Sequence, residues 1–349
     1  MSQADITEFQ NSSTYPKIFW ESSEQHTILL ATGNDPQSKA PRFFCGDFSS
    51  APDNSLYTPT CLKEIPSIDL AAPNPMPRMI NRMDLPEKST WDQTIYHALK
   101  SIEQGMLNKV VLARKTTLSF ESPLHPLSVL LRLRRQAHPI ATFFCLQSAP
   151  HKAFLGATPE RLFSRSGRHL STMAVAGTRR RSADVSEDEA LAHELLHSIK
   201  DKREVDIVVD SIIEHLSPFC EKIDLSPLTI LKSAYVQHLY YPIRAVLKEG
   251  VSDSMLIQAL HPTPAVGGSP KPVALAFIGQ HESFSRGPYA APIGWLGTER
   301  SEISVAIRSA LIDGSTLHLF AGTGIVQGSD PDAEWQELEH KISQFLRLA

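Results

Sequence analysis

The 349-residue chain has 42% hydrophobic and 21% charged residues, a composition typical of a globular protein with a large core and one or two domains. Its formal net charge of −4 gives no electrostatic reason to expect nucleic acid or an anionic membrane as partner, so a small molecule is favoured. The four cysteines are too widely spaced for a disulfide framework or a zinc motif. The first residues resemble no secretion signal, and no run of about 18 apolar residues occurs, so we expect a cytoplasmic protein.

The first 88 residues contain short strand-like runs at 18–20, 27–30 and 42–45, followed by a proline-rich connection over 65–86. None of these runs carries a diagnostic motif. We therefore predict a division into residues 1–88, a variable N-terminal part of the same fold, and residues 89–349, the ligand-binding region.

A helix is predicted from Thr90, and a strand follows at 109–114. Lys109 at the head of this strand is either an exposed strand-end lysine or a lysine that points into a site. A helix at 126–136 and strands at 141–147 and 153–156 come next. Glu160 then follows a glycine and a proline at a bend, where functional side chains are often presented.

A strand at 170–175 passes through Gly177 into three arginines, for which a solvated loop is favoured over a polyanion-binding site. The capping-box pattern at 186–189 predicts the start of a long helix that is kinked near residues 200–201 and ends at about Leu216. Glu204 on this helix is either a surface residue or a carboxylate ligand of a metal ion.

Downstream, a Pro- and Gly-rich loop at 261–271 has the composition of a functional loop. Strands are predicted at 291–296, interrupted by Gly294, at 303–312 and at 316–321. Arg308 is then a charge inside an apolar strand, and such a charge needs a partner. A substrate carboxylate would bind it through two hydrogen bonds.

The C-terminal segment reads as a strand, a turn containing Gly322 and Gly324, and a helix capped at residues 329–331. Glu334, Glu337 and Lys341 project from one face of this helix. Glycine backbone at a helix entrance suits an anion, and two carboxylates suit a divalent metal such as Mg²⁺. An alternative is an ordinary solvated helix face.

Taken together, eight motifs resemble those of the chorismate-utilising enzymes, most closely the isochorismate synthases of menaquinone or siderophore pathways. They lie at 109–114, 154–160, 176–181, 236–239, 261–268, 286–295, 305–310 and 321–341. The resemblance covers residues 90–345 and implies an α/β (α+β) fold of two packed, largely antiparallel sheets with helices outside, rather than a Rossmann sheet.

The resemblance also implies a reaction and a site. The reaction is the reversible, Mg²⁺-dependent conversion of chorismate to isochorismate, with Lys109 as the general base that activates water for attack at C2 and Glu160 as the general acid that protonates the departing C4 hydroxyl. The implied metal ligands are Glu204 and Glu337, with Glu334 and Asp201 nearby. The implied substrate-binding residues are Thr178, His238, Ala265, Tyr289, Arg308, Gly322, Gly324 and Lys341.

Other members of the family are alternatives. Anthranilate and aminodeoxychorismate synthases carry a different residue where Lys109 stands, and the latter often have lysine where Ala176 stands. In salicylate synthases the loop that corresponds to residues 261–268 contains a threonine, whereas this chain has Ala265 in that loop. Ala291 departs from the glycine that is commoner in the family. A catalytically inactive chorismate-binding paralogue is the non-enzyme alternative, and a monomer or weak homodimer is expected.

Overall fold

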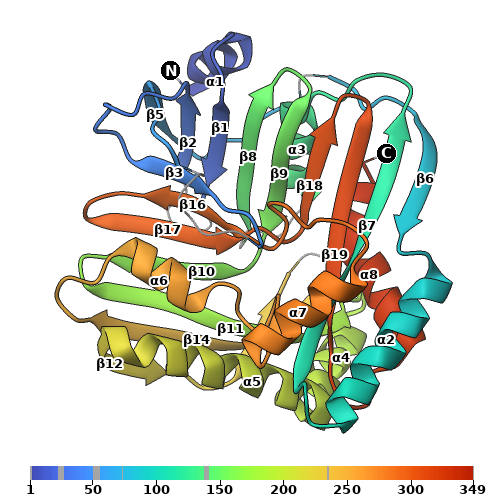
Figure 1. Cartoon of the computed structure of the whole chain (residues 1–349). Helices are drawn as coiled ribbons and strands as arrows, with labels where there is room; N and C mark the ends of the chain where they lie inside the picture. The colour runs from blue at the N-terminus through green and yellow to red at the C-terminus, as the bar shows by residue number, and fades with distance from the viewer. Residues whose placement is uncertain are drawn as a thin grey trace.

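A computed structural model describes residues 2–22, 27–49, 56–72, 74–136, 141–233 and 236–348. The described strands form two sheets, of ten and nine strands, in which neighbouring strands are antiparallel. This confirms the expected fold class. In Figure 1 the strands of one sheet run across the direction of the other, with helices on the outside. Pro73, which falls in the predicted proline-rich connection over 65–86, lies outside the described residues.

The ten-stranded sheet has the order β15-β7-β19-β18-β9-β8-β1-β2-β5, with β6 also paired to β7. Its strands are β1 (Lys17–Glu21), β2 (Thr27–Thr32), β5 (Cys61–Pro66), β6 (Met79–Leu85), β7 (Lys109–Phe120), β8 (Thr142–Ala149), β9 (Lys152–Thr158), β15 (Gly268–Ser269), β18 (Ser309–Asp313) and β19 (Thr316–Ile325). The first six residues of β7 are all buried, as the predicted apolar run at 109–114 requires.

The nine-stranded sheet has the order β12-β14-β11-β10-β17-β16-β3-β4, with β13 also paired to β14. Its strands are β3 (Arg42–Cys45), β4 (Leu56–Tyr57), β10 (Arg161–Ser166), β11 (His169–Arg180), β12 (Cys220–Leu225), β13 (Thr229–Lys232), β14 (Val236–Leu247), β16 (Pro292–Leu296) and β17 (Arg300–Val305). Residues before 88 thus contribute strands to both sheets. The predicted division at residue 88 remains a prediction.

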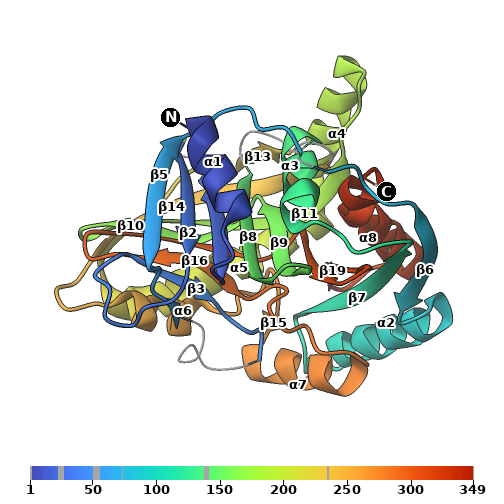
Figure 2. The same cartoon turned by 90° about the horizontal axis from the view of Figure 1, so that it is seen from above.

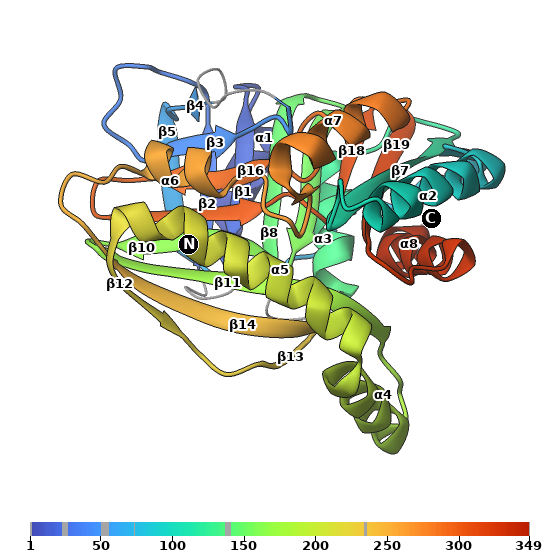
Figure 3. The ribbon, with the colours of Figure 1, turned by 60° about the horizontal axis from the view of Figure 1, so that its bottom comes forward.

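The helices cover the outer faces and edges of the sheets. They are α1 (Ser2–Asn11), α2 (Lys88–Glu103), α3 (Pro126–Gln136), α4 (Val185–His197), α5 (Ile199–Leu216), α6 (Asp253–Leu260), α7 (Lys271–His281) and α8 (Pro331–Leu346), with a short 3-10 turn at Ser217–Phe219. Figure 2 shows α2 and α7 along one side of the molecule, beside β7, and α4 projecting on the opposite side. In Figure 3, α5 lies across β11 and β14. No described helix is long and apolar enough to cross a membrane.

Apolar side chains join the two sheets. Trp20 and Phe144 of the ten-stranded sheet pack with Phe43 and Trp295 of the nine-stranded sheet in one buried cluster. A larger cluster continues between the sheets and the helices. The sheets therefore form one packed unit, so that residues far apart in sequence can be held in fixed positions between them.

Three predictions about strands and helices are wrong. The strand predicted at 303–312 is two strands, because the chain leaves the nine-stranded sheet after Val305 and enters the ten-stranded sheet at Ser309. Gly294 does not interrupt β16. A Cβ atom there would lie 1.9 Å from the carbonyl oxygen of Glu302, so glycine lets β16 and β17 pair closely. Helix α4 begins at Val185, capped by Asp184 rather than by the predicted box at 186–189.

The predicted long helix breaks at Ser198, just before the predicted kink. The Ser198 side chain accepts a hydrogen bond from the backbone N–H of Asp201 and so caps the start of α5. The arginine triplet is also not a solvated loop. Arg179, Arg180 and Arg181 each form an ion pair with a carboxylate of α4 or α5, which attaches α4 to the end of β11.

Candidate active site

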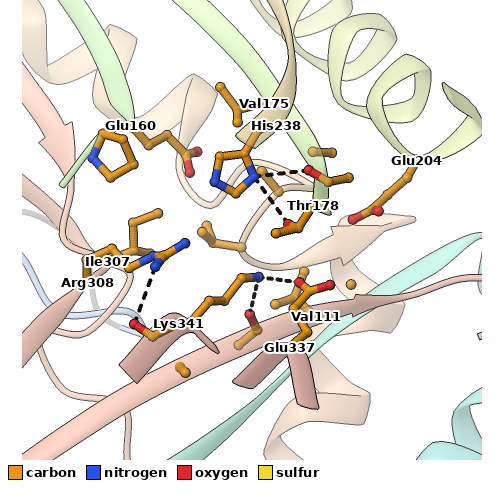
Figure 4. A pocket seen from close by; sticks show the side chains of 18 of the residues that line it. Val111, Glu160, Val175, Thr178, Glu204, His238, Ile307, Arg308, Glu337 and Lys341 are labelled. Carbon is orange, nitrogen blue, oxygen red and sulfur yellow. Dashed lines mark hydrogen bonds and ion pairs between the residues drawn. The ribbon is translucent and has the colours of Figure 1, made fainter. Parts of the chain in front are cut away.

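The candidate site is a cleft at the place where the chain crosses from one sheet to the other. It encloses about 700 Å³, part of it open to solvent. Two crossings lie side by side here, between β9 and β10 and between β17 and β18. The backbone N–H of Val305 donates to the carbonyl of Glu160 at 3.0 Å, and the N–H of Ala157 donates to the carbonyl of Arg308 at 3.1 Å. The two crossings therefore place Glu160 and Arg308 at the same cleft (Figure 4).

Glu160 lines this cleft and is only 7% exposed. Burial raises the pKa of its carboxyl group to about 7, against the opposing influence of Lys109 and Lys341. A carboxyl group with this pKa keeps its proton over much of the range near neutral pH. Glu160 can therefore donate a proton, which is the property that the predicted general acid needs.

Arg308 occupies the second crossing with a backbone φ of +52°, a conformation that is uncommon for a residue other than glycine. The prediction that it lies inside a strand is therefore wrong. Its Nη1 donates to the carbonyl of Lys341 at 3.3 Å. Burial lowers the pKa of its guanidinium to about 10 although Glu337 opposes this. Arg308 thus presents a desolvated cation to the cleft, as the predicted carboxylate-binding role requires.

Gly322 and Gly324 lie within β19, paired with Ala113 and Val111 of β7, and do not form the predicted turn. They matter because, without side chains, they leave room for side chains from other segments. A Cβ atom at Gly324 would lie 2.3 Å from Oε1 of Glu204, and one at Gly322 would lie 2.9 Å from the hydroxyl of Tyr289. Both glycines line the cleft, and they allow side chains from other segments to reach it.

Lys109 is buried directly behind this wall. Its side chain is 1% exposed, and its Nζ lies 2.8 Å from Oε1 of Glu204, a residue that lines the cleft. A Cβ atom at Gly324 would lie 2.7 Å from Cε of Lys109. The alternative of an exposed strand-end lysine is therefore wrong, and Lys109 belongs to the site through Glu204.

Helix α8 supplies Glu337 and Lys341 to the cleft. Asp330 caps the helix by accepting hydrogen bonds from the N–H groups of Asp332 and Ala333, as predicted. Lys341 lies 2.5 Å from Oε1 of Glu337 and donates to the carbonyl of Gly322 at 2.8 Å. Although burial alone would raise it, the pKa of Glu337 is lowered because Lys341 stabilises its charge.

Glu334 and Asp201 do not line the cleft. Oε1 of Glu334 lies 2.9 Å from Nζ of Lys200, and its other oxygen accepts a hydrogen bond from Thr323. Burial and the neighbouring charge of Glu337 raise the pKa of Glu334. Asp201 lies 2.9 Å from Nη2 of Arg179. Both carboxylates therefore sit beside the cleft rather than in its wall.

His238 lines the cleft as a neutral imidazole, because burial lowers its pKa to about 3. Its Nδ1 lies 3.0 Å from the carbonyl of Gly177, which can only accept, so Nδ1 carries the proton. The hydroxyl of Thr178 lies 3.2 Å from the same nitrogen. The remaining nitrogen, Nε2, can accept a hydrogen bond, for example from a substrate hydroxyl (Figure 4).

The remaining predicted residues, Ala265 and Tyr289, also line the cleft. Sequence reasoning missed an apolar part of the wall, which consists of Val111, Val175, Val266, Ile307 and Phe320. The ring of Tyr289 stacks on Phe320 with centroids 5.2 Å apart. All five residues lie inside or directly beside the recognised motifs, but their apolar character resembles that of ordinary core residues. The cleft thus combines charged groups with apolar walls, as sites for small ligands usually do.

The carboxylates can be tested for their fit to a metal ion. Within the described part of the chain, no group of three or more His, Cys, Asp or Glu side chains is arranged to hold one. Mg²⁺, however, commonly binds one or two protein carboxylates together with substrate oxygens and water. Glu204 and Glu337 are two such oxygen donors in the wall of one cleft, so the donor set fits Mg²⁺ that is shared with a bound substrate.

The fold is of the class in which two antiparallel sheets pack together, here with a cleft of buried charged side chains where the chain crosses between them. A family model described as "Chorismate binding enzyme" matches residues 59–348. The chain therefore belongs to the chorismate-binding enzyme family, which confirms the resemblance expected from the sequence.

The similar proteins carry more specific names. The chloroplastic isochorismate synthase of Catharanthus roseus is 39% identical over 275 residues, which are 77% of this chain but 47% of that protein. The putative isochorismate synthase of Aeromonas hydrophila is 32% identical over 356 residues, covering 98% of this chain and 90% of that protein. The solved structure of MenF, the menaquinone-specific isochorismate synthase from Escherichia coli, has a TM-score of 0.89 at 29% identity, covering 98% of this chain and 90% of that one.

The chain spans only about half the length of the first curated relatives that it matches, for example 47% and 48% of the two plant proteins. A structure of anthranilate synthase component I from Streptococcus pneumoniae also matches, with a TM-score of 0.72 at 19% identity. That second likeness shows that the fold is shared by enzymes with different activities.

Proposed function

We propose that this protein is an isochorismate synthase, an isomerase that converts chorismate to isochorismate reversibly and requires Mg²⁺. The observation that carries the proposal is a buried acid in the wall of the cleft and a buried lysine directly behind that wall, paired with the cleft residue Glu204. The pKa of Glu160 is raised to about 7 by burial, and Lys109 lies 2.8 Å from Glu204. In Figure 4, Glu160 and Glu204 lie at opposite ends of the pocket. A ring bound between them would have the carboxyl group of Glu160 on one side and Glu204, with its partner Lys109, on the other.

Each group then has one role. Lys109 takes a proton from water as the water oxygen attacks C2 of the ring. Both ring double bonds shift, from C1=C2 and C5=C6 to C1=C6 and C4=C5, and Glu160 gives its proton to the C4 hydroxyl, which departs as water. One water is added and one is lost, and a proton must pass from Lys109 back to Glu160 before the next turnover, so the net reaction is an isomerisation. Each positioned proton transfer contributes a factor of about 10²–10⁴ in rate.

Chorismate carries two carboxylates, and the cleft offers cations for both. Arg308 and Lys341 are cationic side chains in the wall, and the hydroxyl of Tyr289, which lines the same cleft, lies next to Gly322 of β19. We assign one carboxylate to Arg308 and Tyr289. His238, whose Nε2 is free to accept, would bind a ring hydroxyl, while the apolar wall excludes bulk water.

We assign the Mg²⁺ site to Glu204 and Glu337, with Glu334 and Asp201 supporting them from beside the cleft. When bound, the ion supplies positive charge that orients a substrate carboxylate. The protein contributes the two carboxylates on facing helices, α5 and α8. Lys109 and Lys341 balance their charges in the absence of the ion.

The test is incubation of the purified protein with chorismate and Mg²⁺, with and without EDTA, followed by separation of isochorismate, salicylate and pyruvate. Isochorismate that forms only with the metal, with little pyruvate, would support the proposal. Salicylate and pyruvate in equal amounts would reassign the protein to the salicylate synthases. Chorismate binding without turnover would indicate the inactive paralogue.

Two variants assign the roles. Lys109→Gln and Glu160→Gln keep similar shapes and should each reduce kcat by about 10²–10⁴ while chorismate still binds. Wild-type activity in Lys109→Gln would exclude lysine as the base.

A further inference from the structure

The outer edge of β7 has a gap in its strand pairing next to the cleft. Over the described residues, β15 pairs with Lys109 and Val110, and β6 pairs with the strand from Lys115 onward. Neither strand covers residues 111–114, although the N–H of Val111 donates to the carbonyl of Gly267 in the 261–268 loop at 2.9 Å. Backbone groups on an uncovered buried edge need other hydrogen-bond partners.

Two side chains fill this gap. Nη2 of Arg286 donates to the carbonyl of Val111 at 2.8 Å, and Oε1 of Glu282 accepts from the N–H of Ala113 at 2.8 Å. Arg286 and Glu282 are themselves joined by two hydrogen bonds, at 2.8 Å and 2.5 Å, and their side chains are only 2% and 5% exposed. The ion pair therefore takes the place of the missing strand.

The same arginine also holds the opposite wall. Its Nη1 donates to the carbonyl of Val266 at 2.8 Å, in the 261–268 loop that carries Ala265. Val111, Ala265 and Val266 line the cleft, whereas Arg286 does not. One guanidinium thus fixes a strand and a loop that form two parts of the wall, without being able to touch a ligand.

We propose that Arg286, held by Glu282, is a positioning residue that sets the spacing between β7 and the 261–268 loop and thereby the fit of the substrate. The proposal rests on the function proposed above. Lysine cannot replace arginine here, because its single ammonium cannot bind a carboxylate bidentately and also reach two carbonyls on different segments. A misplacement of about 1 Å in such a wall can cost about 10²-fold in catalytic efficiency.

A matched control is available in Arg165, which forms an ion pair with Asp253 at 2.6 Å and 2.9 Å and donates to the carbonyl of Gly297 at 3.1 Å. Neither Arg165 nor these partners line the cleft. Arg165→Lys therefore removes a similar ion pair without affecting the wall.

The experiment compares Arg286→Lys with Arg165→Lys by thermal unfolding, by KM and kcat for chorismate, and by hydrogen exchange of the 263–268 amides. We expect both variants to lose stability. Only Arg286→Lys should raise KM by about 10-fold or more and accelerate exchange in the loop. Glu282→Gln keeps the shape of the pair and should also raise KM and accelerate exchange in the loop. It replaces Arg286→Lys in the comparison if that variant does not fold.

Equal losses of stability with KM and loop exchange unchanged would overturn the inference and leave Arg286 a structural residue. If the wild-type protein does not convert chorismate, the proposed function fails instead. The exchange measurement then still decides whether Arg286 holds the loop.

Discussion

The Nζ atom of Lys109 lies 2.8 Å from Oε1 of Glu204, and the pair is packed against the Cα atom of Gly324. The two residues come from different elements, the start of β7 and the N-terminal half of α5. They meet only because β19 carries no side chain at residue 324. The geometry of the proposed base therefore depends on a third residue that has no functional group.

Gly324→Ala should consequently inactivate the protein. The new Cβ would lie 2.3 Å from Glu204 and 2.7 Å from Lys109, so at least one of the two side chains must move. We expect kcat/KM to fall by about 10²-fold or more and stability to fall by about 1–3 kcal/mol. Gly279→Ala is the control, because nothing lies within 4 Å of a Cβ there and alanine favours a helix. Full activity in Gly324→Ala would contradict the assigned geometry.

The pH dependence of the reaction should report Glu160. Because burial raises the pKa of this carboxyl to about 7, the proposed acid loses its proton as the pH rises through that value. We expect kcat to fall above about pH 7 in the wild-type protein. In Glu160→Gln the residual rate should lack this decline. A wild-type profile that stays flat from pH 6 to pH 9 would count against Glu160 as the acid.

The same carboxyl should also affect stability. Its folded-state pKa lies above its unfolded value, so the stability that it contributes is fully present below about pH 4.5 and is lost as the pH rises through about 7. A difference of this size corresponds to about 2–4 kcal/mol. Glu160→Gln should therefore be more stable than the wild type at pH 8 but not at pH 4, as measured by denaturant unfolding at both pH values.

Local sequence patterns predicted much of the fold. Alternating and apolar runs located strands such as those at 18–20, 27–30 and 42–45, and the Asp330 cap located the start of α8. These signals are local, because hydrophobic spacing and capping depend on neighbouring residues only. The resemblance, not the local patterns, predicted that two sheets would pack together.

The errors near the site have a different origin. Gly322 and Gly324 were interpreted as a turn because glycine is common in turns, but they make room for Tyr289 and Glu204, which are distant in sequence. Arg308 was placed inside a strand because its neighbours are apolar, but there the chain changes sheets. Such features follow from tertiary contacts, which override local propensity.

Metal binding can be tested separately from turnover. With Mg²⁺ and chorismate present, the wild-type protein should unfold at a higher temperature, since ligand at about 100 times its Kd contributes about 2.7 kcal/mol. Glu337→Gln should lose most of this metal-dependent shift. Glu339→Gln is the control on the same helix, because Glu339 pairs with Arg114, at 2.7 Å, and does not line the cleft. It should lower stability but keep the response to Mg²⁺. An equal response in Glu337→Gln and the wild type would remove Glu337 from the proposed metal site.

Replacement of Arg308 should show that its conformation in the site lowers the free energy of unfolding of the protein. Its backbone has a φ of +52°, which glycine adopts without strain, and burial lowers the pKa of its guanidinium to about 10. Relief of such backbone strain is worth about 1 kcal/mol or more. We therefore expect Arg308→Gly to match or exceed the wild type in its free energy of unfolding. It should nevertheless bind chorismate about 10²-fold more weakly, because a charge-assisted bidentate contact is lost.

Arg308→Lys separates charge from backbone, since it keeps a cation and the strained φ but cannot bind a carboxylate through a planar fork. Its affinity for chorismate should lie between those of the wild type and Arg308→Gly, with no gain in stability. Calorimetric titration with chorismate, alongside denaturant unfolding, measures both quantities. If Arg308→Gly bound chorismate as tightly as the wild type, the strained arginine would have no role in binding the substrate. If Arg308→Gly bound chorismate weakly yet unfolded less readily than the wild type, the backbone strain at Arg308 would be explained by its role in binding the substrate.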